Sequence, residues 1–158
     1  MYPPSSTVYD KAKWHYGGDY PEDLPDSQAF VHTGIYLGWL IENDLIDDAE
    51  PPFNEPEFKE AFQQFKAREV TPVTISEESF DGCLSDDTLT DQGNKFTHFY
   101  YSGEYLDDYE TFLADENIPT LYHVPFTWDA YSKISRVIDK RYKKWISNKN
   151  PRWWEFWK

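Results

Sequence analysis

The chain is poor in cysteine, in basic residues and in long apolar runs. Its single cysteine, Cys83, cannot form a disulfide within the chain, which suits a fold kept in a reducing compartment. No stretch approaches 18 uninterrupted apolar residues, and the N-terminus lacks the basic and then apolar pattern of a signal peptide. We therefore expect a cytoplasmic protein without a membrane span or a standard export signal.

The shortage of basic residues is confined to one part of the chain. Residues 1–127 hold 26 acidic and 6 basic side chains, a formal charge of −20, whereas residues 128–158 hold 3 and 9, a charge of +6. So large an acidic excess repels nucleic acid and anionic lipid and attracts basic proteins. The charge therefore favours a basic protein partner and disfavours nucleic acid and membranes as partners.

Aromatic residues are abundant and have to supply much of the core. Trp, Tyr and Phe make up 19% of the chain within a hydrophobic content of 39%, and each ring can bury about 150–250 Å². A length of 158 residues is typical of one domain. We expect a mainly α fold, a single compact helical domain over residues 1–150 with about five helices and little or no β-sheet.

Hydrophobic periodicity and capping residues predict where the helices lie. Residues 28–43 leave almost no polar face and should form a central buried helix, in which Gly34 and Gly38 share one face and let another element approach closely. Thr127 should cap a last helix with an apolar stripe and a basic outer face. The other expected elements are an irregular segment at 9–25, helices at 54–69, 86–102 and 105–115, an edge strand at 71–75 that contains Pro72, and an extended piece at 121–125.

The basic helix and the tail that follows it, residues 151–158, have several possible roles. Four of the eight tail residues are Trp or Phe, so the tail can finish the core, contact a partner or a second copy of the chain, or enter a membrane interface. The acidic body disfavours the membrane. The acidic body opposes binding of the basic helix to nucleic acid, and pairing between the helix and the body within the chain is the expectation.

No motif predicts a catalytic residue, a metal site or a cofactor. The four histidines include no His-x-x-x-His pair, and no Cys-x-x-Cys pair exists, so a metal site would have to be assembled from distant segments. We expect His15 and His32 to be hydrogen-bonded within the fold. The acidic neighbours of Cys83 raise the pKa of its thiol and disfavour a nucleophilic role.

Clustered carboxylates are the candidate partner-binding residues. Solvated surface, contact with a basic partner, and catalysis or binding of a hard cation are the three interpretations, although the calcium-loop pattern Asp-x-Asp-x-Asp-Gly is absent. The candidates are Asp19, Glu22, Asp23, Asp26, Asp47, Asp48, Asp86, Asp87, Asp107 and Asp108.

The N-terminal motif carries a family resemblance. Residues 9–25 read Tyr-Asp-x-Ala-x-Trp-His-Tyr, then Gly, then Tyr-Pro-x-Asp-Leu-Pro, and His32-Thr33-Gly34 follows. Together with shorter matches as far as residue 145, this opening resembles an uncharacterised family of small bacterial proteins. The resemblance implies a single-domain cytoplasmic protein and an association with toxin immunity genes, but no activity.

Two functions are therefore open. The first is an acidic protein-binding module, most concretely an immunity protein that neutralises a basic toxin such as a nuclease by direct binding. The second is a small-ligand-binding protein or enzyme that uses a pocket around His15, Asp19 and His32. Convergence of His15 and His32 with carboxylates would favour the second.

Overall fold

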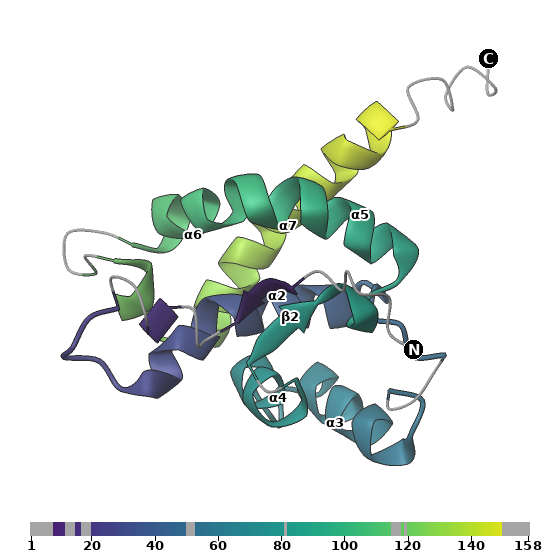
Figure 1. The fold of residues 1–158 in the computed structure, drawn as a ribbon, viewed down its shortest axis with the longest axis horizontal. Helices are drawn as coiled ribbons and strands as arrows, with labels where there is room; N and C mark the ends of the chain where they lie inside the picture. Colours follow the sequence, from purple (N-terminus) through teal and green to yellow (C-terminus); the bar gives the residue numbers. More distant parts are fainter. Residues whose placement is uncertain are drawn as a thin grey trace.

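The helices of the fold are arranged around one buried helix, α2 (Val31–Glu42). The computed structural model describes residues 8–11, 15–16, 20–49, 53–80, 82–114, 118 and 120–149. Over these residues it holds six α-helices and one two-stranded sheet, which confirms the expected mainly α fold. Helices α3 (Pro56–Lys66) and α4 (Pro72–Ser79) lie on one side of α2, and α5 (Asp91–Tyr100) and α6 (Leu106–Leu113) run along the opposite side (Figure 1).

Helix α2 is buried along its length. Its residues from Val31 to Ile41 are all buried, as the absence of a polar face predicted. A short 3₁₀ helix, η1 (Asp26–Phe30), leads into it, so the expected start at residue 28 falls within η1. The expectation for Gly34 and Gly38 is confirmed: a Cβ on Gly34 would lie 2.9 Å from the Val73 Cα, and a Cβ on Gly38 would lie 2.9 Å from the Pro72 Cβ. Helix α4 therefore packs directly against the α2 backbone.

The strand expected at residues 71–75 is wrong, because these residues begin α4. Thr71 caps the helix by accepting a hydrogen bond from the Thr74 backbone N–H at 3.2 Å, and Pro72 occupies the first helical turn. A threonine cap followed by proline is a helix start, since the missing N–H of proline costs nothing there. This start outweighed the β-branched alternation of a five-residue stretch.

A small sheet joins the start of the chain to its middle. Strand β1 (Val8–Lys11) pairs antiparallel with β2 (Cys83–Ser85), with Asp10 opposite Leu84 and an irregularity between Val8 and Asp10. Neither strand was predicted, because three or four residues carry little periodicity. The pairing holds Asp10 on the buried side of β1, with 4% of its surface exposed.

The helices α5 and α6 are joined by a π-helical turn, η3 (Tyr101–Tyr105). The expected helix at 86–102 begins later than predicted: residues 86–88 form the 3₁₀ helix η2 (Asp86–Thr88), and Thr90 caps α5 through the Gly93 backbone N–H at 3.0 Å. A π turn adds a residue to one turn and so changes which side chains face inward. Here Tyr101 and Tyr105 both point into the core.

The last helix, α7 (Trp128–Lys149), crosses the body, and its C-terminal end projects beyond the other helices (Figure 1). Thr127 caps it as predicted, accepting from the Ala130 N–H at 2.9 Å. Trp39 Nε1 on α2 donates to Asp139 Oδ1 on α7 at 2.8 Å. None of the described helices is both long and apolar enough to cross a membrane. The tail at 151–158 lies outside the described residues.

The segment before α7 also differs from the prediction. Residues expected to be extended at 121–125 include a 3₁₀ turn, η4 (Leu121–His123). Gln28 in η1 holds this segment by donating through Nε2 to the carbonyls of Tyr122 and Val124, at 2.9 and 3.2 Å. These contacts bring Tyr122 to the N-terminal end of α2.

We predict that Gly34→Ala destabilises the protein. Although alanine favours a helix by about 1 kcal/mol, its Cβ would meet backbone atoms of α4 that cannot move separately. We expect a net loss of about 1–3 kcal/mol in the free energy of unfolding, measured by urea denaturation. Gly103→Ala is the control, because no atom lies within 4 Å of its added Cβ. Equal stability of the two variants would contradict the close packing of α4 on α2.

Candidate functional site

Three side chains that can bind a metal ion converge near the N-terminal end of α2. They are Asp10 on β1, His32 on α2, and His15, which follows β1 in the sequence. One donor atom from each residue lies within 4.8 Å of the others. His15 Nε2 lies 2.7 Å from Asp10 Oδ1, His32 Nε2 lies 3.0 Å from Asp10 Oδ2, and the two Nε2 atoms are 3.2 Å apart. Both histidines therefore face the same carboxylate.

Burial makes this cluster distinct from a surface ion pair. The His32 side chain is 1% exposed and that of Asp10 is 6% exposed, whereas the His15 side chain keeps 12%. Asp10 is held inward by strand pairing, and His32 lies in the first turn of the buried helix. Two members of the cluster, Asp10 and His32, are thus buried, and the cluster reaches the surface through His15.

Two hydroxyl groups complete the hydrogen bonding of Asp10. Tyr101 donates to Asp10 Oδ2, and Thr33 Oγ1 donates to the same oxygen at 3.3 Å. Tyr105, four residues after Tyr101 in the π turn, donates to the backbone carbonyl of His32 at 2.7 Å. The π turn therefore aims one tyrosine at the carboxylate and a second at the helix that carries His32.

The outer nitrogen of His15 has its own partner. Its Nδ1 lies 2.6 Å from the hydroxyl of Tyr122 in η4. The rings of His15 and Tyr122 meet edge to face, with centroids 5.3 Å apart. Tyr122 thus orients the most exposed member of the cluster.

The surroundings set the protonation states. Burial alone would raise the pKa of Asp10, but hydrogen bonds from His15, His32 and the Tyr101 hydroxyl together hold that pKa well below its usual range. Burial raises the pKa of Tyr101 well above its usual value, and the Asp10 charge adds to this. Burial lowers the pKa of His32, against the opposing effects of Asp10. Asp10 is therefore an ionised acceptor, Tyr101 a donor, and His32 is biased toward its neutral form.

This arrangement supports two kinds of chemistry. Two neutral imidazoles and one carboxylate are ligands that zinc and ferrous ions accept. Alternatively, Tyr122, His15 and Asp10 form a chain in which the histidine can accept a proton at Nδ1 while Asp10 stabilises the charge at Nε2. Both uses depend on the neutral form of a histidine.

The comparisons with known proteins add a family. A family model described as a domain of unknown function, DUF7832, matches residues 8–124. The chain belongs to the DUF7832 family. No curated protein and no solved structure matches it. The matched range of the DUF7832 model contains all three members of the cluster and their tyrosine partners, and it ends before α7.

The DUF7832 fold brings together part of the pocket expected from the sequence. His15 and His32 do meet, and each is hydrogen-bonded as expected. Asp19, the third expected residue, lies outside the described residues. The carboxylate between the histidines is Asp10, which sequence reasoning missed, although it stands in the motif that carried the family resemblance. Its place beside Tyr9 in an aromatic, acidic stretch gave no sign that it is buried.

The acidic candidates lie at separate places on the DUF7832 fold. Glu22, Asp23 and Asp26 are exposed near the N-terminal end of α2. Asp47 and Asp48 adjoin η2, because the Asp47 N–H donates to the Thr88 carbonyl at 3.0 Å. The pairs 47–48 and 86–87 thus form one acidic region.

Asp108 does not belong to that surface. It is 6% exposed and accepts from the Tyr100 hydroxyl at 2.7 Å and from Arg141 Nε and the Arg141 terminal nitrogen at 3.0 and 2.9 Å. Its neighbour Asp107 is exposed. The prediction of a partner-binding Asp108 is therefore corrected: its carboxylate joins α6 to α7, since a buried charge needs a counter-charge. Arg141 also pairs with Glu104, at 3.4 Å, so part of the basic helix does pair with the acidic body.

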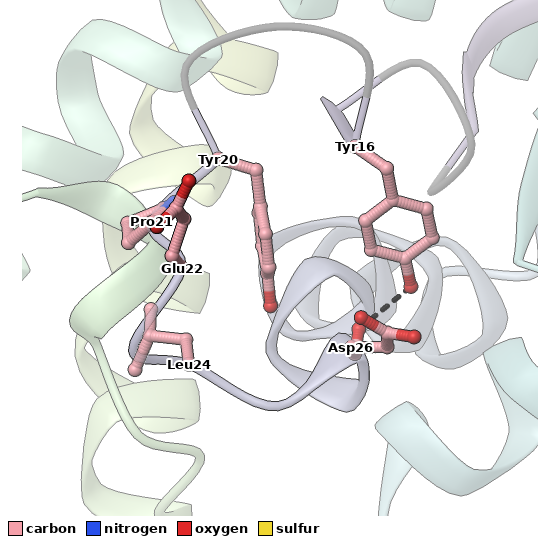
Figure 2. A pocket seen from close by; sticks show the side chains of 6 residues that line it. All are labelled: Tyr16, Tyr20, Pro21, Glu22, Leu24 and Asp26. Atoms are coloured by element: carbon pink, nitrogen blue, oxygen red, sulfur yellow. Dashed lines mark hydrogen bonds between the residues drawn. The ribbon is translucent and has the colours of Figure 1, made fainter.

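A shallow hollow of about 390 Å³ opens beside the cluster. It is lined by Tyr16, Tyr20, Pro21, Glu22, Leu24 and Asp26. Figure 2 shows the Tyr20 ring between two groups, with Pro21, Glu22 and Leu24 on one side and Tyr16 and Asp26 on the other. Tyr20 also meets Tyr122 edge to face, with ring centroids 5.1 Å apart. Tyr122 therefore contacts both Tyr20, in the wall of the hollow, and His15.

We predict that Tyr101→Phe lowers the free energy of unfolding of the protein without bound metal. The substitution removes a hydrogen bond to the buried Asp10 carboxylate, and bonds to charged groups contribute about 1.5–3 kcal/mol. Urea denaturation with EDTA present should show a loss of that size. Tyr109→Phe is the matched control, because the buried Tyr109 hydroxyl has no hydrogen-bond partner among the described residues. An equal loss for both would contradict a stabilising contribution of the hydrogen bond to Asp10.

Proposed function

We propose that the protein binds a divalent transition-metal ion through Asp10, His15 and His32. The observation that carries the proposal is the convergence of one carboxylate and two imidazole nitrogens from separate parts of the chain onto one partly buried point. Zinc is the first candidate and ferrous iron the second, since both accept two histidines and a carboxylate.

The spacing of the donor atoms supports this. Ligands of a tetrahedral zinc ion lie roughly 3.3 Å apart, because each bond is about 2.0–2.2 Å long. The contacts here are 2.7 Å from His15 Nε2 to Asp10 Oδ1, 3.0 Å from His32 Nε2 to Asp10 Oδ2, and 3.2 Å between the two Nε2 atoms. Both carboxylate oxygens thus face the histidines, and small outward movements of the side chains would admit an ion. The neutral bias of His32 and the ionised state of Asp10 are those that binding requires.

The groups around the ligands support it as well. A histidine bound to a metal usually donates its other ring N–H to a neighbour, which fixes the orientation of the ring. With Nε2 on the ion, His15 Nδ1–H would donate to the Tyr122 oxygen 2.6 Å away. Tyr101 and Thr33 would likewise hold the carboxylate. Because three protein ligands leave one coordination position to water or substrate, the site has the ligand count of a catalytic rather than a structural zinc centre.

We predict that one equivalent of zinc binds the wild-type protein and that its removal lowers the melting temperature. Isothermal titration calorimetry with Zn²⁺, and visible absorption with Co²⁺ as a spectroscopic substitute, should show one site. His15→Ala, His32→Ala and Asp10→Asn should abolish it, because each removes a ligand. Tyr122→Phe should weaken binding by about 10- to 100-fold, the usual cost of losing a group that orients a ligand.

His98→Ala is the control, because His98 is exposed on α5 and is not part of the cluster. Its affinity should equal that of the wild type. Circular dichroism and thermal melts with EDTA separate lost binding from lost folding in the ligand variants. Titration with Fe²⁺ without oxygen tests the second ion. Absence of binding for all three ions, or the same single site in the His32→Ala variant, would overturn the proposal.

The exposed acidic residues favour a second candidate, an acidic protein-binding module. In its most concrete form this is a bacterial immunity protein, located in the cytoplasm, that neutralises a basic toxin such as a nuclease by direct binding. Glu22, Asp23 and Asp26 are exposed around the tyrosine-lined hollow, and Asp48 and Asp87 are exposed in the acidic region beside η2. Tyrosine beside carboxylates suits a binding surface, since rings supply contact area and charge speeds encounter.

For this second candidate we predict that charge reversal at Glu22, Asp23 and Asp26 to lysine slows association with a basic partner at least about tenfold at low salt and flattens the salt dependence. The partner is first captured from the host at low salt, then purified and measured by surface plasmon resonance. A second variant with Asp47, Asp48 and Asp87 changed to lysine carries the same change in net charge elsewhere. If neither variant slows association, the charge-based binding function is wrong.

A further inference from the structure

The tyrosine-lined hollow has the features of a receptor for an organic cation. Its two rings, Tyr16 and Tyr20, meet at 88° with centroids 5.3 Å apart, so they form two walls of a corner. A positive group over the face of an aromatic ring within about 6 Å is attracted by the ring's quadrupole. Two perpendicular faces allow one cation to contact both.

The rings are fixed before any ligand arrives. The Tyr16 hydroxyl donates to the Asp26 backbone carbonyl at 2.7 Å, and the Tyr20 hydroxyl donates to the Pro25 carbonyl. Since the hydroxyls already have partners, the hollow offers ring faces rather than hydroxyl groups. Rings held in place lose little conformational entropy when a ligand binds.

The charge around the hollow is negative. Glu22 and Asp26 line it and are exposed. Across the part of the chain that the structure describes, no ion pair of Lys, Arg or His involves either carboxylate. Burial, and then the negative charge of Asp26, raise the pKa of Tyr16. The hollow therefore has aromatic faces and uncompensated negative charge together.

The size and openness of the hollow suit a side chain better than a free metabolite. Its volume of about 390 Å³ is at the lower end of the roughly 300–1,000 Å³ of small-molecule sites. Tyr16 remains 40% exposed, so the hollow does not enclose what it holds. A guanidinium or ammonium group on a flexible stem, presented by a basic protein surface, fills such a hollow without needing to be enclosed.

We propose that the hollow between Tyr16 and Tyr20 receives an arginine or lysine side chain of a basic protein partner, with Glu22 and Asp26 as its counter-charges. The inference rests on the second proposed function and names the contact that it would use. It is independent of the metal proposal, because neither tyrosine is a ligand in the Asp10 cluster. Arginine fits better than lysine, since a planar guanidinium stacks on one ring while its N–H groups reach a carboxylate.

The test is an NMR titration of the ¹⁵N-labelled protein with a five-residue peptide that holds one arginine. The matched peptide carries citrulline, which has nearly the same shape without the charge. We expect saturable shifts in residues 16–26 with the arginine peptide and at least about tenfold weaker binding of the citrulline peptide. Equal binding of the two peptides, or no saturable shifts there, overturns the inference.

Variants test the two parts of the hollow separately. Tyr20→Leu should weaken binding of the arginine peptide about 3- to 30-fold. Tyr20→Phe keeps the ring face, and its affinity should stay within about threefold of that of the wild type. Glu22→Gln with Asp26→Asn should weaken it as well. Glu57→Gln with Glu60→Gln is the control for net charge, because both residues are exposed on α3 and neither lines the hollow. Thermal melts check that each variant is folded.

The hollow and the wider binding function fail in different ways. Suppose that association with a basic partner depends on Glu22, Asp23 and Asp26 but is unchanged by Tyr20→Leu. The role of the hollow as the receptor for a basic side chain is then refuted, and the protein-binding function stands. If the arginine peptide binds the hollow but no basic protein depends on the acidic residues, the cation site stands and its assignment to a protein partner is refuted.

Discussion

A buried carboxylate, Asp10, is the constraint on which the functional end of the molecule depends. An ionised side chain taken out of water costs several kcal/mol unless hydrogen bonds and opposite charge compensate it. Four side chains from separate parts of the chain supply that compensation: His15, His32, Thr33 and Tyr101. Strand β1, helix α2 and the π turn are therefore joined through one group, and the same joining brings two imidazoles to one point.

Helix α2 supplies the second constraint, because other elements pack on its buried surface. Its glycines let α4 lie against its backbone, and Trp39 joins it to α7. Its N-terminal end carries His32 and is preceded by η1, in which Gln28 donates to the Tyr122 carbonyl and the Asp26 carbonyl accepts from Tyr16 of the hollow. The candidate metal site and the hollow thus lie at the same end of one rigid helix. Tyr122 contacts His15 on one side and Tyr20 on the other.

The elements that could be predicted are those with strong local causes. Helix α2 was recognised because a run without a polar face has no alternative but burial, and α7 because Thr127 and a regular apolar stripe mark it. The segment after Thr71 was assigned wrongly because its β-branched alternation competed with a cap and a proline. The sheet and the π turn were not predicted, since both depend on partners far away in the chain. Asp108 was assigned to the surface because Arg141, 33 residues later, gave no local sign of its approach.

The sequence by itself determined the class of the molecule: a mainly helical fold with an aromatic core, an acidic body and a basic last helix. These follow from composition and local periodicity, which act on each segment independently of the others. Only the tertiary structure decided where chemistry can occur. Asp10 and His15 are 5 residues apart and His15 and His32 are 17 apart, so neither of these pairs has the three- or four-residue spacing of neighbours on a helix or the even spacing of one strand face. They meet because strand pairing turns Asp10 inward and the buried helix holds His32 against it, and both are long-range contacts that no local pattern encodes.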